Sequence, residues 1–109
     1  MKRIPLSPYP GQLIVAKDWA EFREIFKEYT FDECDHGRAD GTTIKLMSKQ
    51  GTTHYLVHAK RESSRSTLAH ELGHVVLFLF KDVGIDPADG GGEPFCYLLS
   101  HLMEEALKK

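Results

Sequence analysis

The chain has 109 residues, which is enough for one compact domain over residues 1–109 and too few for separate catalytic and regulatory domains. Its 14 basic and 16 acidic residues are interspersed and give a net charge of −2 at pH 7, so the composition lacks the basic surface of a nucleic-acid-binding protein. We therefore expect no nucleic-acid partner.

The sequence favours a soluble cytoplasmic protein without a membrane partner. Prolines interrupt the first ten residues, which prevents the apolar region of a signal peptide, and the longest apolar run, 75–80, is far shorter than a membrane span. Cys34 and Cys96 lie far apart and form no CxxC pair. Two free thiols in a reducing compartment are the simpler interpretation.

The first third of the chain predicts an arm, a strand and a helix. Residues 1–11 are expected to form an extended arm stiffened by proline, and residues 12–16 a short strand. Asp18 and Glu21 have the spacing of a reciprocal helix N-cap. Residues 18–30 are therefore predicted to form an amphipathic helix, with a stripe of Trp19, Phe22, Ile25, Phe26 and Tyr29 packed on the core.

The middle of the chain predicts a hairpin. Residues 32–41 are acidic and rich in turn formers, and they end in an Asp-Gly turn signal. Residues 42–48 and 52–59 are rich in β-branched side chains and flank a Gln50-Gly51 turn. We expect an antiparallel pair of strands here.

Two further helices follow the hairpin. An apolar pattern covers residues 64–81, and we expect that helix to stop at Gly84, because glycine favours the position after a helix. A Gly- and Asp-rich loop over 85–92 leads to Glu93-Pro94, where proline is tolerated in the first turn of a third helix. The expected fold class is α+β, with three helices and a small antiparallel-type sheet.

The central helix carries the pattern His-Glu-Leu-Gly-His, an HExxH motif. Four residues turn an α-helix by about 400°, so His70 and His74 are separated by only about 40° and about 6 Å along the axis. Both imidazoles can then reach one metal ion, and Glu71 can touch a water on that metal without being a ligand. HExxH on an amphipathic helix is the motif of zinc-dependent peptidases. The alternative is a pair of solvated histidines with an ordinary glutamate between them.

A catalytic zinc needs a third protein ligand and an open fourth position. In the metzincin motif a glycine follows the second histidine by three residues and a third histidine follows it by six. Leu77 and Phe80 occupy these two positions here, so the chain lacks the metzincin motif. The gluzincin solution is a glutamate on a following helix, and Glu93 lies 19 residues after His74. We therefore expect Glu93 to be the third ligand. The loop carboxylates Asp86 and Asp89 are the alternatives.

These residues resemble a known group of proteins. The segment TLAHELGHVVLFLF, followed by VGID and EPFCYLLSHL, looks like small phage- and prophage-encoded zinc metallopeptidases, which pair an AHExxH helix with a helix that opens E-x-x-x-Y-L. The stretch RADG over 38–41 also has a counterpart there. The likeness covers residues 38–102, and a more distant one joins the chain to minimal gluzincin domains of the ImmA/IrrE and SprT types.

The resemblance implies a zincin-like fold and peptide-bond hydrolysis with Zn²⁺ as cofactor and a protein or peptide as substrate. Zinc makes a bound water more acidic and polarises the scissile carbonyl, and Glu71 would take the proton from that water. Tyr97, one turn after Glu93, would stabilise the oxyanion or support the site. An extended substrate would lie along strand 52–59, taken as the sheet edge.

A second class of function stays open. A zinc-containing binding or regulatory protein would keep the same fold with little hydrolytic activity, although a structural zinc has no use for a base such as Glu71 between two ligands. His54 and His58 are also four residues apart, but on a strand this spacing separates them by about 13 Å, too far to share a metal. We expect them at the surface or on a cleft wall.

Overall fold

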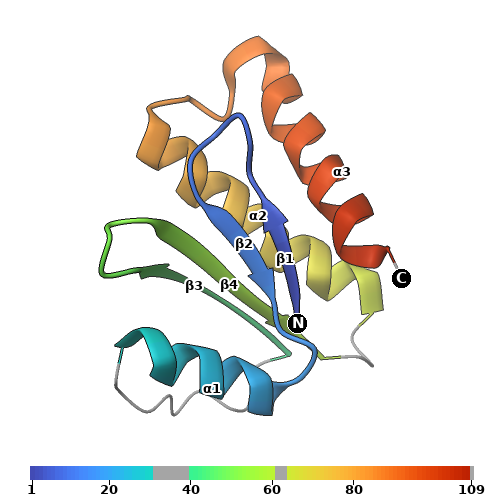
Figure 1. Ribbon diagram of the computed structural model, residues 1–109. Coiled ribbons are helices and arrows are strands. Elements are labelled where there is room, and N and C mark those ends of the chain that lie inside the picture. The colour runs from blue at the N-terminus through green and yellow to red at the C-terminus, as the bar shows by residue number, and fades with distance from the viewer. Residues whose placement is uncertain (31–39, 61–63, 109) are drawn as a thin grey trace.

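The structure is a computed structural model that describes residues 1–30, 40–60 and 64–108 (Figure 1). Within these residues the fold has three helices and a four-stranded sheet, so the predicted α+β class is correct. In chain order the elements are β1 (Lys2–Pro5), β2 (Gln12–Val15), α1 (Trp19–Thr30), β3 (Gly41–Met47), β4 (Thr53–Ala59), α2 (Ser64–Val83), the short 3-10 turn η2 (Asp89–Gly92) and α3 (Glu93–Leu107).

The sheet has the order β1-β2-β4-β3 and is mixed. β3 pairs with β4 in antiparallel fashion, as the hairpin predicted, and β1 pairs with β2 in the same way. β2, however, runs parallel to β4, with Gln12 opposite His54. The expected antiparallel-type sheet was therefore wrong. The chain passes from β2 through α1 and β3 before it returns as β4, a connection long enough to bring two strands into parallel pairing.

The expected N-terminal arm is a strand of this sheet. Ile4 and Leu6 alternate inward and are buried at 4% and 2% exposure, which ties the first residues to the core. Pro5 is tolerated because β1 is an edge strand, where a missing N–H costs no ladder hydrogen bond.

Alternate residues of the sheet feed two separate cores. Leu13, Tyr55 and Val57 point to the face that α2 and α3 cover, and their neighbours Ile14 and Leu56 point to the face that α1 covers. This follows from the two-residue period of a strand. The result is a sheet between one helix on one side and two helices on the other (Figure 1).

Helix α1 begins where its sequence predicts. The Asp18 side chain accepts a hydrogen bond from the Glu21 amide at 2.8 Å, and the Glu21 carboxylate accepts one from the Lys17 amide at 3.0 Å. The second bond keeps the pKa of Glu21 below its usual value. The predicted acidic turn over 32–41 lies almost wholly outside the described residues.

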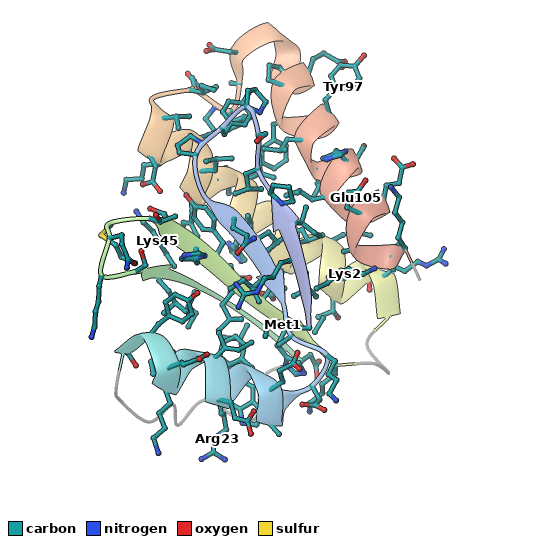
Figure 2. The ribbon with its side chains drawn as sticks, viewed as in Figure 1. Met1, Lys2, Arg23, Lys45, Tyr97 and Glu105 are labelled. Atoms are coloured by element: carbon teal, nitrogen blue, oxygen red, sulfur yellow. The ribbon has the colours of Figure 1, made fainter. Side chains whose placement is uncertain are left out.

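Helix α2 is fixed to the strands below it by Asp82. Its carboxylate accepts hydrogen bonds from the Lys45 ammonium at 2.8 Å and from the Tyr55 hydroxyl at 2.7 Å (Lys45 is labelled in Figure 2). These bonds lower the pKa of Asp82, with the Lys45 bond the largest cause. Because Lys45 belongs to β3 and Tyr55 to β4, the pair sets the position of α2 across both strands.

Helix α3 returns beside α2. After α2 the backbone turns at Gly84, whose φ of 78° suits glycine, and the Ile85 amide bonds to the Phe80 carbonyl at 2.9 Å. At its far end α3 is tied to β1, because the Lys2 ammonium donates to the carbonyls of Glu105 and Ala106 at 3.2 and 3.1 Å (Figure 2). In the part of the chain that the structure describes, no helix is long and apolar enough to cross a membrane.

Candidate functional site

The structure brings His70 and His74 together on α2. Their Nε2 atoms are 3.2 Å apart and their ring centroids 4.8 Å apart. His70 is exposed and His74 half-buried, with the Phe78 ring stacked against His74 at 6.3 Å. The helical period places two imidazole nitrogens at one point on the molecular surface, as the sequence spacing predicts.

Glu71 lies beside this pair but is turned toward the sheet. Its side chain is 7% exposed, and its Oε1 atom accepts a hydrogen bond from the Thr43 hydroxyl of β3 at 2.7 Å. The same hydroxyl lies 3.1 Å from the Glu71 carbonyl oxygen. Thr43 therefore fixes one carboxylate oxygen of Glu71, and Oε2 has no hydrogen-bond partner among the residues that the structure describes.

Glu71 also lies close to Gly41, at the start of β3. A Cβ atom at Gly41 would stand 2.7 Å from Glu71 Cγ and 2.8 Å from Glu71 Oε2, closer than real Cβ contacts come. Glycine is needed here for space: the strand can approach the carboxylate only because residue 41 has no side chain.

A cleft of about 390 Å³ opens beside these groups, between the start of β3 and the first turns of α2. The unpaired oxygen of Glu71 lies next to Gly41 at this cleft, so a small polar molecule in it can meet both a carboxylate and an imidazole. The cleft is lined by Asp40, Gly41, Ser66, Thr67, His70 and Glu71.

The structure does not bring Glu93 to the histidine pair. Phe95, two residues after Glu93, packs edge-on against Phe80 with ring centroids 6.3 Å apart. Phe80 follows Glu71 by nine residues, or two and a half helical turns, so it lies on the side of α2 opposite Glu71. Glu93 is exposed in the first turn of α3, and within the described residues it does not form a three-residue metal-binding group with His70 and His74.

Tyr97 and the loop carboxylates lie outside the cleft as well. Tyr97 is 73% exposed on the outer surface of α3 (Figure 2). Asp86 is exposed and accepts a hydrogen bond from the Ala88 amide at 2.9 Å, and Asp89 is exposed in η2. Within residues 1–30, 40–60 and 64–108, no group of three His, Cys, Asp or Glu side chains is placed to hold a metal. The third ligand stays a prediction.

The second pair of histidines differs from the expectation. His58 is 5% exposed and packs against Trp19 and Phe22 of α1, at ring-centroid distances of 5.7 and 6.3 Å. His54 is half-buried, 5.1 Å from the Tyr29 ring. The expectation of a surface or cleft-wall position was therefore wrong for His58, which lies in the core under α1. Burial lowers the pKa of both histidines, because it disfavours the charged imidazolium.

Strand 52–59 is not a sheet edge. β4 lies between β2 and β3, and within the described residues the edge strand near Glu71 is β3. The expectation failed because an isolated hairpin has two edges, and the sequence did not show that β2 covers one of them. Thr43 and Gly41 were missed for a related reason: each is unremarkable in the sequence, and only the packing of α2 on β3 gives it a role.

Comparison with known proteins found no matching protein-family model, no matching curated protein and no matching solved structure.

Proposed function

We propose that the protein is a zinc-dependent metallopeptidase of a minimal zincin-like kind, in which His70 and His74 bind the metal and Glu71 acts as general base. The observation that supports this most directly is the 3.2 Å separation of the two Nε2 atoms. Two nitrogens bound at 2.0–2.1 Å to a tetrahedral zinc lie about 3.3 Å apart. The pair therefore fits two of the ligands of a catalytic zinc, although one hydrogen bond between neutral rings would have a similar length.

Zinc held by these histidines would acidify a water and polarise a carbonyl, which is the chemistry that HExxH sites use. The chain supplies the proton transfers. Thr43 holds Glu71 Oε1, so the carboxylate is fixed in one orientation with Oε2 at the cleft. From that position Glu71 takes the proton of the attacking water and then passes it to the leaving amine.

The position of β3 at the edge of the described sheet supports a peptide substrate. An extended peptide can add to an exposed sheet edge through main-chain hydrogen bonds, and β3 carries both residues that contact Glu71. A peptide paired with the Gly41 end of β3 would therefore pass the cleft. This replaces strand 52–59 as the proposed substrate strand.

The third ligand and the role of Tyr97 are separate parts of the proposal. We retain Glu93 as the proposed ligand, with Asp86 and Asp89 as alternatives, although α3 would have to shift to bring Glu93 to the pair. Zinc affinity of Glu93→Gln, Asp86→Asn and Asp89→Asn separates the three. Loss of zinc from Glu93→Gln alone supports the proposal, and full zinc in Glu93→Gln refutes that part of it. A cleavage rate in Tyr97→Phe equal to the wild-type rate would remove Tyr97 from the site.

The decisive experiment measures zinc and cleavage together. We expect about one zinc per chain in wild type and in Glu71→Gln, with hydrolysis of a mixed peptide library by the wild type only. The loss in Glu71→Gln should be about 100-fold or more, the usual contribution of a positioned base. Stoichiometric zinc without cleavage by either protein would instead indicate the non-catalytic zinc-binding protein. Absence of zinc from both would refute the proposal.

A further inference from the structure

A second cavity lies at the start of α2, away from the histidines. It has a volume of about 370 Å³, at the lower end of the range of small-molecule sites. It shares no lining residue with the cleft beside Glu71. Figure 1 shows the C-terminal end of α3 beside the first turns of α2, where this cavity forms. Its walls are Val15, Ala16, Ala59, Lys60, Arg65, Leu68 and Leu107.

Five of these side chains are apolar, and they come from four elements or their ends. Ala16 and Leu68 are buried, whereas Leu107 is 43% exposed in the last turn of α3. An apolar group that enters the cavity would remove Leu107 and the other apolar wall residues from water, which is favourable. The cavity therefore suits an apolar group of limited size.

The two remaining side chains are basic. Arg65 is exposed, and no carboxylate is paired with it in the described part of the chain. Lys60 has one ion pair there, with Asp40 at 3.9 Å, between side chains that are 44% and 74% exposed. Such a long, exposed pair contributes little. The first turn of α2, a helix of 20 residues, adds the positive end of its dipole to the same region.

We propose that this cavity binds a small apolar carboxylate, with the chain in the apolar pocket and the carboxylate between Arg65 and Lys60. The charge complementarity is specific, because a planar guanidinium pairs with a carboxylate through two parallel hydrogen bonds. A linear chain of about eight carbons suits the size of the cavity. This binding does not depend on zinc or on the proposed hydrolysis, so the two proposals fail separately.

Octanoate is the probe. In a titration of the whole chain followed by amide NMR, we expect saturable shifts at Ala59, Leu68 and Leu107, with a Kd of about 1 mM or tighter. Butyrate, which lacks the chain, and 1-octanol, which lacks the charge, should each bind at least about tenfold more weakly. Equal binding of octanol and octanoate, or shifts that do not saturate, would overturn the proposal.

Two variants and a matched control test the site itself. Arg65→Gln and Leu107→Asn should each weaken octanoate binding at least about tenfold, because one removes the bidentate partner and the other the apolar wall. Both positions are exposed, so the fold is retained. Arg23→Gln, on the exposed face of α1 (Figure 2), removes the same charge elsewhere and should change nothing. Unchanged affinity in Arg65→Gln refutes the proposal.

The natural carboxylate can come from a fatty acid or from the C-terminus of a peptide. A short acetylated peptide that ends in leucine, compared as free acid and as amide, distinguishes the two sources. Tighter binding of the free acid than of octanoate assigns the cavity to peptide C-termini, and the reverse order assigns it to fatty acids. Equal binding of acid and amide, together with octanoate that does not bind, would overturn the proposal.

Discussion

Two pairs of histidines with the same sequence spacing behave in opposite ways. His70 and His74 lie on α2, where four residues make little more than one turn and the Nε2 atoms meet at 3.2 Å. His54 and His58 lie on β4, where four residues extend the chain by about 13 Å. A four-residue spacing alone therefore does not predict a metal site. The prediction also needs the type of element, because only a helix brings residues four apart close together.

The surroundings of the two pairs differ as well. His70 is exposed to solvent, so a metal ion can reach its ring. His58 is buried among Trp19 and Phe22, and the Nδ1 atoms of His54 and His58 have no hydrogen-bond partner among the described residues. The pair on α2 is available for chemistry, and the pair on β4 supports the packing of α1.

The largest effect expected from this contrast is on zinc binding. His70→Asn should weaken zinc binding by about 100-fold or more, because it removes one nitrogen ligand of the pair. His54→Asn is the matched control and should leave zinc binding unchanged. Isothermal titration of each variant with zinc measures both. Equal losses in the two variants would mean that the helical pair has no special role.

The next effect concerns the base that lies beside the helical pair. Gly41→Ala places a Cβ atom 2.7 Å from Glu71 Cγ and 2.9 Å from Thr67 Cγ2, so Glu71 must move. We expect peptide cleavage to fall more than tenfold and stability to fall by about 1–3 kcal/mol. Chemical denaturation and the library assay measure the two quantities.

Gly73→Ala is the control for that change. A Cβ atom at Gly73 meets nothing within 4 Å outside its own helix, and alanine favours a helix over glycine by about 0.8–1.0 kcal/mol. This variant should therefore be more stable than the wild type. If Gly41→Ala were equally harmless, the close approach of β3 to Glu71 would be incorrect.

The smallest effect concerns the pair on β4 and its dependence on pH. Burial keeps the pKa of His54 and His58 below the usual 6.5, so the unfolded chain takes up protons first as the pH falls. Stability is complete above pH 6.5 and is lost below it, by at most about 1.4 kcal/mol per pH unit for each histidine. His58→Phe should flatten this loss in denaturation curves between pH 7 and pH 5.

His101→Gln serves as its control. His101 is exposed on α3, so this variant removes one histidine and leaves the pair on β4 intact. A slope that persists in His58→Phe and disappears in His101→Gln would contradict the assignment of the buried titration to β4.

Local patterns in the sequence predicted most of the elements. The aromatic steps after Asp18 predicted α1, the turn at Gln50-Gly51 predicted the hairpin, and the apolar back of the HExxH segment predicted α2. Each of these depends on residues within a few positions of one another, where helix caps, turn chemistry and the period of the element act directly.

Long-range pairing was the part that the sequence did not reveal. Nothing near Gln12 shows that β2 will lie parallel to β4, and this pairing makes β4 central and leaves β3 at the edge of the described sheet. The site divides in the same way. The helical period alone brings His70 and His74 together, whereas the contact of Glu71 with Thr43 depends on how α2 packs on the sheet.

X-ray absorption at the zinc edge of the zinc-loaded protein tests the central claim most directly, because it counts the ligand atoms and their distances. We predict two imidazole nitrogens at about 2.0–2.1 Å, with the remaining ligands oxygen, and loss of the imidazole signal in a His70→Asn, His74→Asn double variant. Sulfur at about 2.3 Å, or an imidazole signal that survives in the double variant, would contradict the assignment of the metal to the helical pair.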